Sequence, residues 1–258
     1  MRLLIVPAAG LGSRLGGSVP KALVRVSGQP MLDHLLELYR SYVDHVVVVT
    51  HPSFSADVRA HLERRDKLVP DTPRWSLAEQ RAPTGMLDAI LEAAPIVARE
   101  DPINVWITWC DQVGVLSSTA ARLAAADSSK PQPAVALPTI WRRNPYIHFA
   151  RDDDGQIVRV LHRREGDRLP DFGESDMGLF ALSRDAFTHH LPRYAAALEP
   201  GRGTGERNFL PFIAWVSSRA KVVSFTGTDE REAVGVNTSD ELRAVEEWLR
   251  VSRVAPAP

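Results

Sequence analysis

The sequence predicts an α/β fold in which a mixed, mainly parallel sheet is flanked by helices. Apolar, β-branched segments alternate along the chain with segments whose apolar residues recur at helical spacing. The first apolar segment is hydrophobic at consecutive positions, as strands buried on both faces are. A glycine-rich stretch follows it at once, and open α/β sheets bind ligands beyond the carboxyl ends of their strands.

The first half of the chain supplies three expected strands and three expected helices. The strands are residues 3–9, residues 45–50 and residues 103–111, the last of which ends on Asp111. Residues 10–28 form a long glycine-rich loop after the first strand. The helices follow from apolar residues at i, i+3 and i+4 spacing, and they cover residues 30–42, 55–65 and 84–98.

The second half is more mixed. Strands are expected over residues 133–141, 156–163, 174–183 and 221–227, and helices over residues 184–194, 208–219 and 238–250. Prolines and glycines do not cluster into a linker. We therefore expect a single domain over residues 1–250 and a short tail over residues 251–258.

Composition excludes several classes of protein. The net charge is -1, whereas nucleic-acid binders usually carry a strong basic excess, so no nucleic-acid partner is expected. The single cysteine, Cys110, excludes a disulfide within the chain and favours the reducing cytoplasm. No apolar run approaches the roughly 20 residues of a membrane span, and the first apolar run is too short for a signal peptide. We expect a cytoplasmic protein without a membrane partner.

The glycine-rich loop has the chemistry of a phosphate site. Glycines let the backbone approach a phosphate closely, and successive N–H groups can bind an anion. Arg14 and Lys21 add two cations that can neutralise a triphosphate, so both are candidate catalytic residues. The loop lacks the Gly-Lys-Ser/Thr of a P-loop, and Leu15 stands where a dinucleotide fingerprint has its third glycine. The alternative is a plain strand–helix connection with two solvated cations.

Three segments of this region resemble the signature of the sugar-phosphate nucleotidyltransferase family. They are Pro7-Ala8-Ala9-Gly10-Leu11-Gly12-Ser13-Arg14-Leu15, Pro20-Lys21-Ala22-Leu23 and Gly28-Gln29-Pro30-Met31-Leu32. The uridyltransferase domains of bacterial N-acetylglucosamine-1-phosphate uridyltransferases are similar in form over roughly residues 2–250. The resemblance implies a Rossmann-like (GT-A-like) nucleotidyltransferase fold, an NTP donor and Mg²⁺. It also implies that Lys21 contacts phosphate and that backbone holds the nucleotide at Ala8, Ala9, Gly10, Leu11 and Gly12.

The same resemblance implies a metal pair. Asp111 falls where the family has a metal-binding aspartate, here preceded by Cys110 instead of glycine. Asn237 falls at the family's second metal position, just before the final helix. Mg²⁺ prefers oxygen ligands and commonly keeps several waters, so one carboxylate and one carboxamide are an adequate set. The alternatives are a loop-capping acid at Asp111 and a turn residue at Asn237, before a helix capped by Thr238 or Ser239.

Candidate base and acceptor contacts complete the predicted site. Gln80, Thr84 and Gly85 resemble the segment that reads the base, although Pro83 replaces the usual glycine and the glutamine position shifts from Leu77. Thr84 is alternatively a plain helix cap. Glu174 and Asp176 resemble the acceptor strand, with Asp176 in place of an asparagine, and Glu206 resembles another acceptor residue or a first-turn acid. Arg163 and Arg164 either bind the acceptor phosphate or form a solvated strand edge.

These features predict an enzyme that joins an NTP to a small phosphorylated acceptor, most simply a sugar 1-phosphate. About residues 1–125 would bind the nucleotide and about residues 126–250 the acceptor. Two alternatives stay open, namely a cytidylyltransferase that uses an alcohol phosphate or phosphocholine, and a non-catalytic nucleotide sensor. No acetyltransferase activity is expected, because the hexapeptide-repeat extension of the bifunctional relatives is absent from this sequence. The base, the acceptor, the pathway and the oligomeric state are left undetermined by the sequence.

Overall fold

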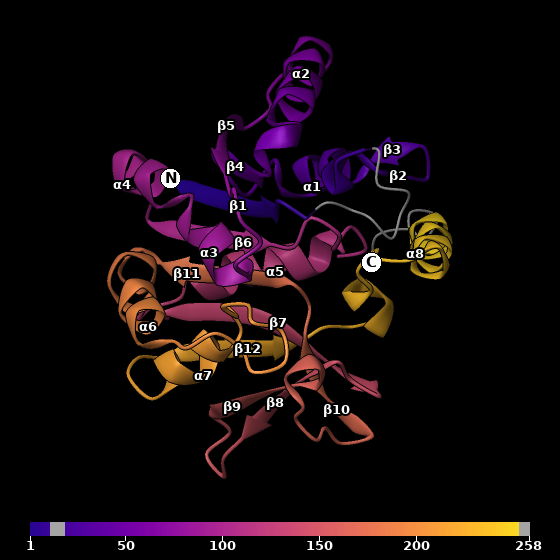
Figure 1. Ribbon diagram of the computed structural model, residues 1–258. Helices are drawn as coiled ribbons and strands as arrows, with labels where there is room; N and C mark the ends of the chain where they lie inside the picture. Colours follow the sequence, from indigo (N-terminus) through magenta and orange to yellow (C-terminus); the bar gives the residue numbers. More distant parts are fainter. Residues whose placement is uncertain (11–18, 253–258) are drawn as a thin grey trace.

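The computed structural model describes residues 1–10 and 19–252 (Figure 1). Eight strands of this part form one mixed sheet: β1 Arg2–Ala8, β4 His45–Thr50, β5 Arg74–Glu79, β6 Asn104–Thr108, β7 Val135–Arg143, β10 Phe172–Asp176, β11 Leu179–Ser183 and β12 Val222–Thr226. Their order is β10-β7-β11-β6-β1-β4-β5, with β12 beside β7. The pairs β1–β4, β1–β6, β4–β5 and β7–β12 are parallel. The pairs of β10 and β11 are antiparallel.

Eight α-helices of the described residues cover both faces of the sheet. Helices α1 Met31–Tyr39, α2 Pro52–Leu68, α5 Ser117–Asp127 and α8 Ser239–Ser252 pack on one face. Helices α3 Met86–Leu91, α4 Ala94–Glu100, α6 Leu191–Ala197 and α7 Pro211–Ser217 pack on the other. This layered arrangement confirms the predicted fold class. None of the described helices is both long and apolar enough to cross a membrane.

The two faces of β1 explain its continuous apolar sequence. Successive side chains of a strand point to opposite faces of the sheet. Leu3 and Ile5 therefore belong to one core cluster, while Leu4 and Val6 belong to the other. Each cluster also contains residues from both halves of the chain, so the two halves share their cores.

Two small sheets lie outside the main one. The strands β2 Arg25–Val26 and β3 Gln29–Pro30 form a hairpin whose turn residues, Ser27 and Gly28, both have positive φ. This hairpin interrupts the predicted loop over residues 10–28, and α8 lies beside it (Figure 1). Strands β8 Ile147–Arg151 and β9 Ile157–His162 form the second small sheet, which contacts β10 and α7.

Several predicted boundaries were wrong. The helix expected over residues 84–98 is two helices, because Pro95 lies in the first turn of the second one and has no backbone N–H to continue the first. The strand expected over residues 174–183 is β10 and β11, divided at Gly178, whose φ is 64°. The helix expected over residues 184–194 opens with a π-helical turn over Ala186–His190 before α6. Asp111 does not end a strand, since β6 stops at Thr108, and α8 extends into the predicted tail as far as Ser252.

Candidate functional site

The site lies at the edge of the sheet where β1 and β6 end. These two strands are adjacent and parallel, so the residues that follow them emerge side by side. Ala9 and Gly10 follow β1, and Ala8 is its last, buried residue. Trp109, Cys110 and Asp111 follow β6. The predicted residues Leu11, Gly12 and Arg14 lie outside the described part of the chain.

Lys21 joins the two residues predicted to bind the metal. Its Nζ donates hydrogen bonds to Oδ2 of Asp111 at 2.6 Å and to Oδ1 of Asn237 at 2.7 Å. The side chains of Lys21 and Asp111 are each only 14% exposed. Lys21 is the first residue of a short 3₁₀ turn that follows Pro20, and this turn sets the position of the Lys21 backbone. Three residues from three distant parts of the sequence therefore meet at one nitrogen atom.

The start of α8 holds Asn237 in this position. Thr238 and Glu241 form a capping box, in which Thr238 Oγ1 accepts from the Glu241 N–H and the Glu241 carboxylate accepts from Thr238 Oγ1. The same carboxylate accepts from the backbone N–H of Asn237. The Nδ2 group of Asn237 donates to Gly235 O, which leaves Oδ1 facing Lys21. Val236 N–H donates to Asp111 O and so ties the two loops together.

The charges at this point favour the protonated lysine. Burial acts to lower the pKa of Lys21, but the nearby acidic groups, above all the Asp111 carboxylate, outweigh it and raise the pKa above its ordinary value. Cys110, beside Asp111, is buried, and burial raises the pKa of its thiol to about 12. The thiol therefore stays protonated at neutral pH and has no nucleophilic role here.

Asp111 and Asn237 are suited to a magnesium ion. Their oxygens converge on a single cationic group, and an anionic and a neutral oxygen are the hard ligands that Mg²⁺ takes. Within residues 1–10 and 19–252, no three His, Cys, Asp or Glu side chains are grouped to hold a metal. A cation at this point would hence rely on this pair together with water and substrate phosphates.

A cavity of about 740 Å³ adjoins this pair. Asp111 and Asn237 line it together with two of the predicted acceptor residues, Asp176 and Glu206. The third predicted acceptor residue, Glu174, does not line it. Its carboxylate is buried and accepts hydrogen bonds from Arg151 at 2.6 and 2.7 Å, so the structure gives Glu174 a buried ion pair in place of the expected acceptor contact.

Asp176 is held at the turn between β10 and β11. Its Oδ2 accepts from the Gly178 N–H at 2.9 Å, and burial raises the pKa of the carboxyl above its ordinary value. A side chain at Gly178 would collide with Gln112 and Trp109, so only glycine permits this close approach. Gln112 is buried and donates from Nε2 to Met177 O. The turn that holds Asp176 is thus packed directly on the loop that carries Asp111.

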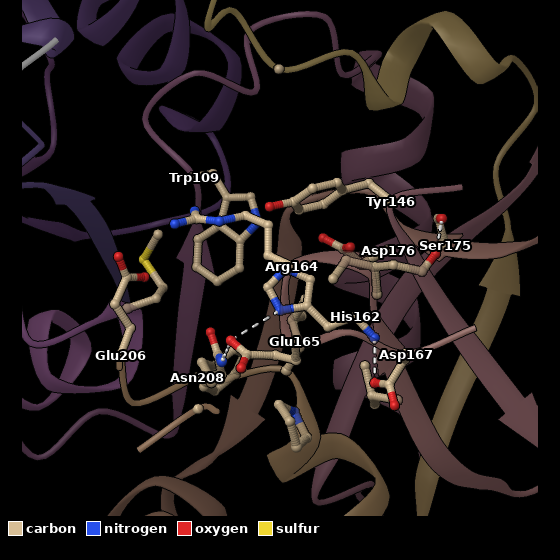
Figure 2. Close-up of a pocket in the computed structure, with 18 of the residues that line it drawn as sticks. Trp109, Tyr146, His162, Arg164, Glu165, Asp167, Ser175, Asp176, Glu206 and Asn208 are labelled. Atoms are coloured by element: carbon tan, nitrogen blue, oxygen red, sulfur yellow. Dashed lines mark hydrogen bonds and ion pairs between the residues drawn. The ribbon is translucent and has the colours of Figure 1, made fainter. Parts of the chain in front are cut away.

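The loop that carries Glu206 is fixed by Glu165. The Glu165 carboxylate accepts from Gly203 N–H at 2.8 Å, Thr204 Oγ1 at 2.5 Å and Asn208 Nδ2 at 3.1 Å. These hydrogen bonds, led by that of Thr204, lower the pKa of Glu165 to about 2. Figure 2 shows Glu165 beside Asn208, with Glu206 at the side of the same cavity. Glu206 precedes α7 by five residues, so it is not a first-turn acid.

The segment predicted to read the base packs closely against the loop that carries Glu206. Gln80 is buried, and its Nε2 donates to Gly85 O at 3.0 Å and, more weakly, to Thr84 Oγ1 at 3.5 Å. The Arg207 N–H donates to Thr84 O and the Leu87 N–H donates to Arg207 O. Gly85 has a φ of 122°, and a side chain there would strike the Arg207 backbone. Thr84 is exposed, while Gln80 acts in this structure as a brace for the segment.

Several cavity residues were not among the predicted site residues: Trp109, Gln112, Arg142, Tyr146 and His162. The sequence did offer a signal for one of them, since Trp109 precedes Asp111. Arg164, for which the sequence left a phosphate contact open, lines the cavity. Arg163 instead donates to Pro145 O. Trp109 packs against Phe180 and Phe209 as well as lining the cavity, so it belongs to both core and site.

Comparison with known proteins identifies relatives of this chain. The chain is 26% identical over 250 residues to the bifunctional protein GlmU of Paraburkholderia phytofirmans. It is 28% identical over 254 residues to that of Cupriavidus metallidurans and 27% identical over 257 residues to that of Heliobacterium modesticaldum. These alignments cover 94–96% of this chain but only 51–52% of the relatives, so it spans about half their length.

These relatives bear out the expected resemblance to the N-acetylglucosamine-1-phosphate uridyltransferases. Residues 4–178 match the model of the MobA-like NTP transferase domain. That match begins in β1 and ends at Gly178, so it includes Lys21, Asp111 and the turn that holds Asp176. The chain therefore belongs to the MobA-like NTP transferase domain family, as a nucleotidyltransferase.

Proposed function

We propose that this chain is a Mg²⁺-dependent nucleotidyltransferase that joins an NTP and a sugar 1-phosphate to give an NDP-sugar and pyrophosphate. The observation that carries the proposal is the convergence of Asp111 and Asn237 on Lys21 Nζ at the wall of a cavity. The family and the GlmU relatives support the same reaction class. We place this activity in the cytoplasm, in keeping with the single cysteine.

In this proposal the residues work by positioning and by electrostatics. An oxygen of the acceptor phosphate attacks the α-phosphorus of the NTP, a new P–O bond forms, and the bond to the bridging oxygen breaks so that pyrophosphate leaves. The attacking oxygen is already ionised at neutral pH, so no side chain has to remove a proton. Mg²⁺ held by Asp111 and Asn237 would neutralise charge on the donor and acceptor phosphates. Lys21 stabilises the negative charge that builds up at the α-phosphorus.

The remaining predicted residues are assigned as follows. The backbone at Ala8, Ala9 and Gly10, with Leu11 and Gly12, would hold the triphosphate, and Arg14 would act beside Lys21. Thr84 and Gly85, braced by Gln80, would face the base. Asp176 and Glu206 would accept hydrogen bonds from acceptor hydroxyls through their carboxyl oxygens. We propose no acceptor contact for Glu174.

The test is pyrophosphate release from UTP, CTP, GTP, ATP and dTTP with Mg²⁺ and a panel of sugar 1-phosphates. Release that depends on both substrates, and that Asp111→Asn abolishes, is the expected result. Release with CTP and choline phosphate alone would favour the cytidylyltransferase alternative. Tight NTP binding without release for every acceptor would favour a nucleotide sensor and would refute the proposal.

A further inference from the structure

The charged side chains of the cavity fall into two groups. Some already form ion pairs or hydrogen bonds within the protein. Asp167 forms an ion pair with Arg159 at 3.1 Å, and the Glu165 carboxylate is occupied by its three donors. These groups form part of the cavity wall, and their charged atoms already have partners within the protein.

Two arginines of the cavity have no such partner among the described residues. Arg164 and Arg202 both line it, and neither donates a hydrogen bond nor forms an ion pair with any residue in the described part of the chain. Figure 2 shows Arg164 among the cavity side chains, drawn between Glu206 and Tyr146 in this view. Their guanidinium groups are available to a ligand.

The fold holds the two arginines on neighbouring segments. Arg164 lies in the 3₁₀ turn Arg163–Glu165, and Arg202 lies in the loop that Glu165 binds. A side chain at Gly203 would strike the carbonyl oxygen of Arg164, so the loop packs directly against the turn. Because Glu165 and Gly203 fix this contact, both arginines are presented to the cavity from a rigid base.

The cationic pair and the proposed metal pair are carried by different segments around the cavity. Asp111, which follows β6, and Asn237, which precedes α8, are joined through Lys21. Arg164 follows β9, and Arg202 lies in the loop before α7. The two pairs therefore line the cavity from separate elements of the fold.

We propose that the acceptor carries a second anionic group, a carboxylate or a phosphate remote from the reacting phosphate, and that Arg164 and Arg202 bind it. Guanidinium groups match both anions through paired N–H donors. Asp176 and Glu206 line the same cavity, and their carboxyl oxygens can accept hydrogen bonds from the hydroxyls of the sugar that carries both anionic groups. This inference rests on the proposed function and narrows its acceptor to an acidic sugar phosphate.

The experiment compares matched acceptors. Glucose, galactose and mannose 1-phosphates are each paired with the corresponding uronic acid 1-phosphate and hexose 1,6-bisphosphate. Dissociation constants are measured by calorimetry with Mg²⁺ and the NTP that gives the largest thermal shift, and pyrophosphate release is followed separately. We expect at least one acceptor with a second anionic group, here called doubly anionic, to bind roughly tenfold more tightly than the hexose 1-phosphate that lacks this group, equal to about 1.4 kcal/mol.

The variants Arg164→Gln and Arg202→Gln assign the effect. Each is expected to weaken binding of the preferred doubly anionic acceptor by roughly tenfold, while binding of the hexose 1-phosphate without the second anionic group changes less than about twofold. Arg168→Gln is the matched control, because Arg168 is also exposed and near the same turn but does not line the cavity. Melting temperatures show that each variant is folded.

The outcomes separate the two proposals. Equal binding of the hexose 1-phosphates and of the doubly anionic acceptors in all three series would overturn the second-anion inference and leave nucleotidyl transfer intact. Equal losses for both acceptor types in the arginine variants would also overturn it, because the arginines would then hold the shared phosphate. Preferential binding of the doubly anionic acceptors without any pyrophosphate release would support the inference while refuting the catalytic function.

Discussion

Lys21 donates a hydrogen bond to Asp111 across 90 residues of sequence, with 2.6 Å between Nζ and Oδ2. The ammonium group lies between Asp111 and Asn237, where the proposed function places a metal ion. A lysine and a divalent cation cannot both occupy this point, since like charges repel strongly at contact distance. In the proposed cycle, Lys21 therefore leaves the pair for the substrate phosphates when the metal binds.

This exchange predicts that Lys21→Met binds metal more tightly than the wild type when no nucleotide is present. The gain should be roughly tenfold, because the competing ammonium is removed. Pyrophosphate release should nevertheless fall by about 100-fold, since the α-phosphorus loses a stabilising cation. Electron paramagnetic resonance with Mn²⁺ measures the first effect. Lys67→Met on the exposed face of α2 is the control, and weaker Mn²⁺ binding in Lys21→Met would refute the exchange.

Gly235→Ala tests whether Asp111 must keep its present orientation. The new Cβ would lie 3.3 Å from the Asp111 carboxylate and 3.0 Å from Gln112 Oε1, closer than most side chains approach. We expect the turnover number to fall by about tenfold with little change in unfolding free energy, because the displaced group is the proposed metal ligand. Gly114→Ala creates similar crowding against Trp248 and Arg231. An equal loss of activity in Gly114→Ala would point to loop packing instead.

Thr238→Ala tests the capping box at the start of α8. Loss of Thr238 Oγ1 removes its hydrogen bonds with Glu241, which should cost about 1 kcal/mol of unfolding free energy. Mn²⁺ binding should weaken less than in Asn237→Ala, because the proposed metal ligand itself remains. Urea unfolding and Mn²⁺ titration provide the two readouts. Wild-type stability in Thr238→Ala would show that the cap makes no contribution.

Glu165→Gln predicts a characteristic dependence of stability on pH. The pKa of Glu165 is lowered in the folded state from 4.5 to about 2, so the carboxylate stabilises the fold. Because the folded pKa is the lower one, this contribution is complete above pH 4.5 and is lost as pH falls toward 2. The stability difference between wild type and Glu165→Gln should narrow over that range in urea unfolding. Glu63→Gln corrects for the change in net charge, and a constant difference would contradict the assignment.

The local pattern of the sequence predicts β1, β4 and α1 well. Continuous apolar residues in β1 and β4, and helical spacing in α1, follow directly from burial. The break at Pro95 and the break at Gly178 are also local signals, and both were overlooked in favour of longer elements. Helix α5 is rich in alanine and was not predicted, because small side chains give a weak periodic pattern.

The site was predictable where it depends on motifs and unpredictable where it depends on packing. Asp111 and Asn237 meet as expected from the family signature, although only the structure shows Lys21 between them. Glu174 matched the motif equally well, yet its carboxylate is taken up by Arg151, a partner from another strand. Pairings of this kind arise from three-dimensional arrangement, which the spacing of residues along a chain does not encode.

The backbone junction between Thr84 and Arg207 has a practical consequence for protein engineering. Arg207 forms main-chain hydrogen bonds with both Thr84 and Leu87. The segment proposed to read the base is therefore packed against, and hydrogen-bonded to, the loop that carries Glu206. A graft that imports one of these segments from another enzyme would inherit a mismatched surface at Gly85. Donor and acceptor preferences are consequently not interchangeable modules, and a transplant must carry both segments as one cassette.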